Sequence, residues 1–321
     1  VEWDQQIADS MKRNHFDIEM FTGDIRNINP QMVKNKIGNV DVIVGGPPCQ
    51  GFSLKGQRGG LEDLRNFLFL EFKKYVGFFK PKYFLLENVP TILTEQGGFF
   101  RDEIIKVFQS VGYNVTAGIL NAADFGVPQN RRRAFFIGSK IKSITLPVGD
   151  LQNKVTVWDA ISDLAYLESG EGAFESEYKI QPQTKYQHWA RSYSKKLYNH
   201  IATNHSPLAI ERLMLIPPEQ GKEHIIKKYK ITSTFGQTWG RLEKNKPSPT
   251  IVTRFDTPSN GKNSHPFLNR AITPREAARI QSFPDDFIFY GNKTSIIKQI
   301  GNAVPPLLAN QIAKHILKYE K

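Results

Sequence analysis

The sequence is poor in cysteine and in long apolar stretches, and both shortages limit what the protein can be. Cys49 is the only cysteine in 321 residues, which excludes an intrachain disulfide and a cysteine-based zinc cluster. No apolar run approaches the ~20 residues that span a bilayer, so no membrane association is expected. The seven histidines lack metal-ligand spacing, and no metal site is predicted. A reducing, intracellular setting is the simpler expectation.

Positive charge is concentrated in one segment of the chain. Residues 179–254 carry 14 Lys and Arg against 4 Asp and Glu, a local charge of +10 within a total of +12. A basic segment on a nearly neutral body predicts a polyanionic partner, with a solvated basic face as the alternative. The chain is long enough for one large and one small domain.

Residues 1–154 alternate short apolar runs with amphipathic segments. This alternation predicts an α/β domain built on a doubly wound, mostly parallel sheet. The expected strands cover residues 40–44, 83–86, 113–120 and 134–138, and the expected helices cover residues 7–16, 64–79 and 104–111.

From residue 155 onward the alternation stops. Residues 155–268 are rich in scattered Lys, Tyr, His and Trp and predict a smaller, irregular second domain. One helix is expected between Trp158 and Leu167.

Residues 269–321 are expected to return to the first domain. Thr273 suits the N-cap of a helix, Pro274 its first position, and Glu276 completes a capping box. A final helix is expected to bury one face, formed by Leu307, Leu308, Ile312 and Ile316.

The stretch around Cys49 carries residues that a core does not require. It reads Gly-Gly-Pro-Pro-Cys-Gln-Gly-Phe-Ser over residues 45–53 and directly follows the first expected strand. A thiol just past the carboxyl end of a sheet strand lies where open α/β sheets place their chemistry. A buried, inert cysteine is the alternative. The flanks favour a nucleophile on a closing loop, because the chain is rigid before the thiol and flexible after it.

Glu87 ends the next expected strand, within Glu-Asn-Val. Successive strand ends lie side by side in a doubly wound sheet, so Glu87 is expected near Cys49. Partial burial there raises the proton affinity of a carboxyl group, which suits a general acid. A helix N-cap carboxylate is the alternative.

Two further stretches stand out. Residues 129–133 read Gln-Asn-Arg-Arg-Arg, and in a strand Arg131 and Arg133 would share a face while Arg132 points away. A basic surface strand is the alternative. Residues 301–306 read Gly-Asn-Ala-Val-Pro-Pro, a rigid turn before the last helix, with a plain helix boundary as the alternative.

Together these stretches resemble the cytosine carbon-5 DNA methyltransferases of bacterial restriction–modification systems. Pro-Cys-Gln, Glu-Asn-Val, Gln-x-Arg-x-Arg, Thr-Pro-Arg-Glu-Ala-Ala-Arg-Ile-Gln-Ser-Phe-Pro-Asp and Gly-Asn-Ala-Val-Pro-Pro occur in that family's order and spacing. The match covers residues 2–136 and residues from 247 to the end. It implies the S-adenosylmethionine-dependent methyltransferase fold, with residues 155–268 as a target-recognition domain.

The resemblance also implies a mechanism. The Cys49 thiolate would attack carbon 6 of a cytosine that is flipped out of the duplex, while Glu87 assists at ring nitrogen 3. Carbon 5 would then take the methyl group of S-adenosylmethionine. Arg133 and Arg131 would hold the cytosine and its neighbouring phosphate. The loop that closes over the site would carry Gln50 and Ser53.

For the cofactor, the resemblance implies contacts from both ends of the sequence. Glu2 would accept hydrogen bonds from the ribose, and Trp3 would stack on the adenine. Asp24 would bind the adenine amino group with Ile25 against the ring, and core packing is the alternative for Trp3 and Ile25. The remaining contacts that the resemblance implies would come from Pro48, Asn302 and Ala303.

Double-stranded DNA is the expected partner, because phosphate contacts supply most of the affinity and the second domain is basic. Arg241, Thr250 and Arg254 are the expected DNA contacts. The family resemblance implies a cytoplasmic, nucleoid-associated enzyme that is monomeric when complete.

One feature of the family is missing from this sequence. The family opens with a strand and Phe-x-Gly-x-Gly, whereas this sequence starts beyond that point, at Val1. We expect an empty slot beside residues 40–44 and an open pocket near Glu2, Asp24 and Asn302. Three alternatives stay open for the first strand: it is disordered, it is omitted from this sequence, or a second polypeptide supplies it.

Three alternatives stay open at the level of sequence. A transfer-RNA cytosine methyltransferase of the same fold is the nearest, although the large basic insert favours DNA. A non-catalytic subunit that binds DNA or completes a partner is the second. A thiol hydrolase is the third, and it is weak because no histidine lies in any of the motifs.

Overall fold

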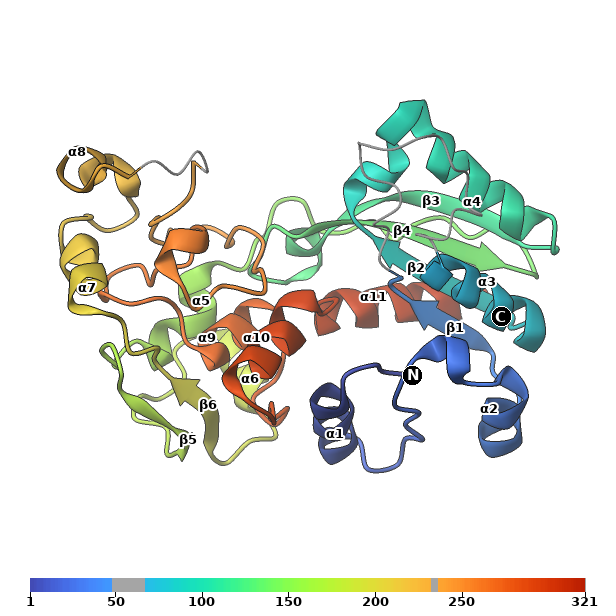
Figure 1. The fold of residues 1–321 in the computed structure, drawn as a ribbon, viewed down its shortest axis with the longest axis horizontal. Helices are drawn as coiled ribbons and strands as arrows, with labels where there is room; N and C mark the ends of the chain where they lie inside the picture. Colours follow the sequence, from blue (N-terminus) through green and yellow to red (C-terminus); the bar gives the residue numbers. More distant parts are fainter. Residues whose placement is uncertain (48–66, 232–235, 321) are drawn as a thin grey trace.

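The computed structural model describes residues 1–47, 67–231 and 236–320. The molecule is elongated, with a four-stranded sheet and its covering helices at one end (Figure 1). A body of helices with a two-stranded sheet forms the other end, and α11 runs from this body back to the four-stranded sheet.

The elements of the described chain have the following bounds. The strands are β1 (Val42–Gly45), β2 (Tyr83–Asn88), β3 (Asn114–Asn121), β4 (Arg132–Ser139), β5 (Gly172–Ser176) and β6 (Leu197–Ile201). The α-helices are α1 (Gln5–Asn14), α2 (Pro30–Ile37), α3 (Phe67–Phe79), α4 (Phe99–Gln109), α5 (Val157–Ile161), α6 (Lys185–Arg191), α7 (Pro207–Met214), α8 (Ile226–Tyr229), α9 (Pro274–Ile280), α10 (Lys293–Asn302) and α11 (Pro306–Leu317). The 3-10 helices are η1 (Ile25–Asn27), η4 (Pro90–Leu93), η5 (Glu95–Gly98), η6 (Ala122–Phe125), η7 (Ser162–Leu164), η8 (Lys222–His224) and η9 (Pro258–Asn260).

The larger sheet has the strand order β1-β2-β4-β3. β1 and β2 are parallel, whereas β4 is antiparallel to both β2 and β3. The positions of the four strands are as the sequence predicts, but the described pairings do not form the mostly parallel sheet that was expected. The link from β3 to β4 contains only the single turn η6, which is too short for a helical crossover, so these two strands pair antiparallel.

Side chains of β2 and β4 alternate between two cores, as the period of a strand requires. Phe84 and Leu86 pack beneath α3 and α4 on one face of the sheet. Tyr83 and Phe135 pack on the opposite face, against α11. The side chains of α11 in this contact are Leu308, Ile312 and Ile316, which confirms the predicted apolar face of the last helix.

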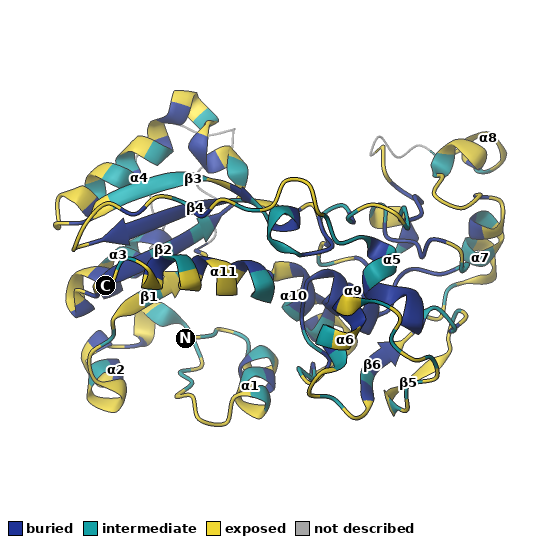
Figure 2. Cartoon of the chain, turned by 180° about the vertical axis from the view of Figure 1, so that it is seen from behind, coloured by how far each residue is buried: buried dark blue, intermediate teal, exposed yellow. Residues whose placement is uncertain are grey.

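The second body has its own core, and this core extends beyond residue 268. Val157, Leu242 and Ile251 pack together with Ala277 of α9 and Ile300 of α10. Nearly all of α9 is buried, as its dark colour in Figure 2 shows. The packing therefore places the return to the four-stranded sheet at α11, later in the chain than the expected boundary at residue 269.

Helix α9 begins with the capping box that the sequence predicts. The Thr273 hydroxyl accepts from the Glu276 amide at 3.1 Å, and the Glu276 carboxylate accepts from the Thr273 amide at 2.8 Å. The amino-terminal helix α1 is tied to the same body, because Asn14 exchanges two hydrogen bonds with the backbone of Ile288.

Candidate active site

The carboxyl ends of β1 and β2 meet, as neighbouring parallel strands should. The side-chain amide of Asn88 donates to the carbonyl of Pro47 at 2.9 Å. A Cβ added at Gly46 would lie only 3.1 Å from Oε2 of Glu87, so the small residue lets the backbone approach that carboxylate. The chain therefore passes Glu87 at Gly46, within the Cys49 stretch and shortly before the cysteine. The predicted site residues Pro48, Cys49, Gln50 and Ser53 lie outside the described residues.

Glu87 forms an ion pair with Arg133 across the antiparallel strands β2 and β4. Oε1 of Glu87 lies 3.0 Å from Nε of Arg133, and each side chain is 18% exposed. Glu87 stands opposite Phe135 in the register, so Arg133, two residues away, lies on the same face of the sheet. Two residues that the sequence predicts to be catalytic are thus in contact.

Burial dominates the proton equilibria of this pair. Burial raises the pKa of Glu87, although the charges of Arg133 and then Arg131 oppose the rise. Burial also lowers the pKa of Arg133, against the opposing charge of Glu87. Both directions show that the loss of water outweighs the attraction between the partners. A carboxyl group in this state takes up a proton more readily than an exposed one, which suits a general acid.

The three consecutive arginines alternate as the sequence predicts. Arg132 is exposed, whereas Arg131 and Arg133 point inward. The role predicted for Arg131 as a base contact needs correction, however. Its side chain is 2% exposed, and its guanidinium donates to the main-chain carbonyls of Ile251 and Gly301 at 3.1 and 3.0 Å.

A cavity of about 760 Å³ lies on one side of β1. Glu2, Trp3, Asp24 and Ile25 line it, together with the Gly45–Pro47 end of the strand. The first four are held together because the Glu2 amide donates to the Phe21 carbonyl at 3.0 Å and the Gly23 amide donates to the Glu2 carbonyl at 2.8 Å. Four predicted cofactor residues therefore share one cavity.

The exposed fractions of Trp3 and Ile25 decide whether each residue packs in a core, which was the alternative to binding a cofactor. Trp3 is 69% exposed, so its ring is not part of a core. Ile25 packs partly against the small core around Val33 and Tyr75, so it serves both the core and the cavity wall. A hydrogen bond from Arg26 lowers the pKa of Asp24, which keeps that group a carboxylate acceptor.

A second cavity, also of about 760 Å³, lies on the other side of β1. It is lined by Val42, Val44, Glu87 and Asn302, and by apolar side chains of α11. Asn302, at the end of α10, is therefore not in the cavity of Glu2 and Asp24, and the expectation of a single pocket is corrected. Ala303, the C-cap of α10, is partly buried against the core of the second body.

The three predicted DNA contacts differ in their surroundings. Arg254 is exposed, and Thr250 is partly exposed with its hydroxyl donating to the Asn130 carbonyl at 2.9 Å. Arg241 is 2% exposed, and the prediction that it contacts DNA is wrong. Its guanidinium is saturated by five acceptors, namely Asn269 Oδ1 and the carbonyls of Leu213, Ile216, His265 and Leu268.

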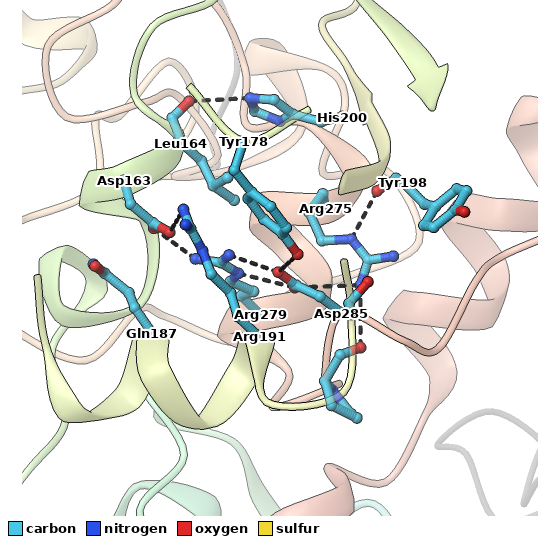
Figure 3. A network of polar contacts seen from close by, with 12 residues as sticks. Asp163, Leu164, Tyr178, Gln187, Arg191, Tyr198, His200, Arg275, Arg279 and Asp285 are labelled. Carbon is cyan, nitrogen blue, oxygen red and sulfur yellow. Dashed lines mark hydrogen bonds and ion pairs between the residues drawn. The ribbon is translucent and has the colours of Figure 1, made fainter. Parts of the chain in front are cut away.

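Sequence reasoning missed a buried network of charged groups in the second body (Figure 3). Arg279 bonds Asp163 at 2.6 Å and Asp285 at 2.7 Å, and all three side chains are fully buried. Tyr178 donates to Asp285 at 2.7 Å, and Arg275 donates to the Tyr198 carbonyl at 2.8 Å. The network fastens α9 to residues 163–198. The Thr-Pro-Arg-Glu-Ala-Ala-Arg motif was the available signal for it.

The family model for C-5 cytosine-specific DNA methylase matches residues 1–318. The chain belongs to this family. The type II methyltransferase M.DdeI of Desulfomicrobium norvegicum is 39% identical to this methylase over 347 residues, covering 99% of this chain and 82% of M.DdeI. M1.HphI of Haemophilus parahaemolyticus is 36% identical over 323 residues, covering 99% and 80%. The crystal structure of a prophage-encoded DNA modification methyltransferase of E. coli matches with a TM-score of 0.74 and 27% identity, over 98% of this chain and 90% of that one.

Two features are absent from the described residues of this methylase. No helix in that part of the chain is long and apolar enough to cross a membrane. The same part contains no group of three or more His, Cys, Asp and Glu side chains that could hold a metal ion.

Proposed function

We propose that this methylase transfers the methyl group of S-adenosylmethionine to carbon 5 of a cytosine in double-stranded DNA, within a restriction–modification system. The observation that carries the proposal is the half-buried Glu87–Arg133 pair beside Gly46 and Pro47, the residues that lead into Cys49. A carboxyl group with a raised pKa at the end of β2, and a thiol that follows β1 in the sequence, would supply the acid and the nucleophile that the reaction needs.

In the proposed reaction the Cys49 thiolate forms a bond to carbon 6 while Glu87 donates a hydrogen bond or proton to ring nitrogen 3. This addition makes carbon 5 nucleophilic. S-adenosylmethionine, when bound, would supply an electrophilic methyl group to carbon 5 and would leave as S-adenosylhomocysteine. Loss of the carbon-5 proton and expulsion of the Cys49 thiolate then restore the aromatic ring. The cytosine must be flipped out of the helix, because stacked neighbours block the approach of the thiol.

The residues around the first cavity fit the proposed cofactor. A volume of about 760 Å³ lies within the usual range for sites of this kind. The exposed indole of Trp3 offers a stacking surface, and the carboxylates of Glu2 and Asp24 offer acceptors for hydroxyl and amino groups. Glu2 would hold the ribose and Asp24 the adenine amino group.

We propose that residues 155–268 form the target-recognition domain. The local charge of +10 over residues 179–254 and the exposure of Arg254 support phosphate contacts in this region. Arg241 supports the domain from within, since it ties three of its segments together.

Exchange of residues 155–268 for those of a related methylase is expected to move methylation to the donor's target sequence, with activity retained. Sequencing of chemically converted DNA from expressing cells locates the modified cytosines for parent and chimera. Asp163 and Tyr178 inside the segment pair with Arg279 and Asp285 outside it, so the donor segment must keep those two side chains. An active chimera with the parent's specificity would place base recognition elsewhere. Methylation of transfer RNA in place of duplex DNA would favour the RNA-modifying alternative.

We also propose that a further strand pairs with the open edge of β1. Among the described residues β1 pairs only with β2, and Val42 and Val44 are 42% and 68% exposed. The second cavity, away from the residues that fit the cofactor, borders this edge of β1. An apolar strand edge left in this state is a site for pairing with another segment.

The 321-residue chain alone is therefore expected to bind S-adenosylmethionine weakly in calorimetry. Addition of a polypeptide of about 30 residues with the Phe-x-Gly-x-Gly segment, the length of a strand and its helix, should restore binding. A matched control is the same addition to a Val44→Lys variant, whose charge obstructs the edge. Tight binding by the chain alone, or equal binding by the Lys variant, would show that the edge needs no partner.

A further inference from the structure

Three segments that are distant in sequence meet around Arg131. The first precedes β4, the second covers residues 248–253, and the third is the carboxyl-terminal end of α10. Arg131 donates to the carbonyls of Ile251 and Gly301 from a side chain that is 2% exposed, so water does not compete for these bonds. Hydrogen bonds from a charged donor are stronger than neutral ones. Arg131 thus clamps two main-chain segments to the strand that carries Arg133.

Two fully buried glutamines make a second link between the same segments. Gln129 accepts from the Ile251 amide at 2.8 Å and donates to the side-chain oxygen of Gln281 at 2.6 Å. Gln281 in turn donates to the Ile300 carbonyl at 2.6 Å. Each amide group uses both its donor and its acceptor, so the pair sets the spacing between residue 251 and α10.

Gly301 shows how closely these segments approach. A Cβ added there would lie 2.8 Å from the Thr253 amide nitrogen and 2.8 Å from the Val252 carbonyl carbon. Any larger residue would push α10 away from residues 252–253. The next residue, Asn302, lines the same cavity as Glu87. The contact at Gly301 therefore joins the segment that carries Thr250 and Arg254 to the second cavity, which contains Glu87.

We propose that Arg131, Gln129 and Gln281 are positioning residues that hold segment 250–254 and the Asn302 end of α10 in register with the Glu87–Arg133 pair. The inference rests on the proposed function, because it takes segment 250–254 as a DNA contact. Arg131 acts on the site through the backbone of Ile251 and Gly301 and does not touch the base. Segment 250–254, when it engages DNA, is thereby set at a fixed distance from the acid.

The test compares Arg131→Met with Arg132→Met, a matched control that removes the same charge from an exposed position on the opposite face. Hydrogen exchange at the Ile251 amide and at residues 301–303 is expected to rise about 10-fold or more in Arg131→Met, the scale of one lost charge-assisted bond, and to stay unchanged in the control. The kcat is expected to fall on the order of 100-fold, as misplacement of a site by about 1 Å can cost, while the KM for DNA stays within about twofold.

Arg131→Lys provides a milder variant that keeps the charge and can reach one of the two carbonyls. It should lose less kcat than Arg131→Met. Only the Met variant should move the alkaline fall of activity to higher pH, because it removes a charge that opposes protonation of Glu87. Unchanged exchange at residues 251 and 301–303, or a raised KM for DNA at unchanged kcat, would overturn the proposal and return Arg131 to a base contact. If the parent protein transfers no methyl group even with the Phe-x-Gly-x-Gly polypeptide added, the proposed function fails, and the exchange measurement still decides the positioning role.

Discussion

Cys49→Ala is expected to abolish methyl transfer and to leave DNA affinity nearly unchanged. The proposed adduct at carbon 6 requires the thiolate, and alanine offers no nucleophile in its place. On the proposed function, affinity for DNA comes mainly from phosphate contacts in the basic second body, which the substitution does not alter. Transfer of labelled methyl groups to duplex DNA measures the first effect, and fluorescence anisotropy with the same duplex measures the second.

The sequence provides an internal control for this experiment. Because Cys49 is the only cysteine, a thiol reagent modifies that position alone, and its effect on the parent protein should match the substitution. The Cys49→Ala protein should resist the reagent. Methyl transfer that persists in Cys49→Ala would contradict the covalent mechanism, whether or not the DNA affinity changes.

Glu87→Gln is expected to slow adduct formation by about 100-fold or more, the usual scale for the loss of general-acid assistance. Glutamine keeps the size of the side chain but loses the proton that the carboxyl group donates. Affinity for S-adenosylmethionine should change little, because the four residues proposed to hold it lie on the other side of β1. Asp102→Asn, at a side chain that is 62% exposed on α4, is a suitable control for the loss of one carboxylate.

The pH dependence of the parent enzyme provides a second measurement for Glu87. Burial raises the pKa of this carboxyl group above its ordinary value. The group acts as an acid only while it is protonated, so activity should be highest below that pKa and fall as the pH rises through it. The fall should be absent in Glu87→Gln. An unaffected rate with a collapse of cofactor binding would show that Glu87 serves the cofactor.

The raised pKa of Glu87 also makes the stability of the folded protein depend on pH. The folded state holds the Glu87 proton more tightly than the unfolded chain does, so this group favours folding at low pH. The contribution is lost as the pH rises through the folded-state pKa. A neutral glutamine at position 87 should remove this dependence.

Local features of the sequence predicted a large part of the fold. Apolar runs located the four strands of the sheet, and Thr273 with Glu276 located the start of α9, because both signals depend on neighbours in sequence. The pairing directions were not predictable in this way. They depend on the turn between β3 and β4, where the chain has no room for a crossover helix.

Arginine was the residue whose role the sequence predicted least well. Arg133 is half-buried against a carboxylate, Arg131 is buried against two carbonyls, and Arg241 is saturated by five acceptors. A guanidinium can be buried wherever distant carbonyls converge on it, and that convergence is set by tertiary structure. The periodicity of a strand correctly separated Arg132 from its neighbours, but no local pattern distinguishes a DNA contact from an internal clamp.

The carboxyl-terminal boundary of the second body was also not predictable from local sequence, because tertiary contacts set it. The composition changes near residue 155, and the structure places α5 and its neighbours there. The regular pattern of α9 led to the expectation that the chain returns to the first domain at residue 269. In the structure, however, Arg275 and Arg279 of this helix bind residues 163–198 of the second body. Buried ion pairs of this kind hold a specific arrangement and are costly to break singly.

The most direct test of the account is the fate of a duplex that carries 5-fluorocytosine at the target position, incubated with S-adenosylmethionine and the enzyme in its cofactor-binding form. Fluorine cannot leave carbon 5 as a proton does, so the reaction should stop at the covalent stage. The account predicts a denaturation-resistant protein–DNA complex in which mass spectrometry of the digested protein locates the nucleotide on Cys49. Methylation of ordinary duplex without such a complex, or a complex attached at another residue, would contradict it.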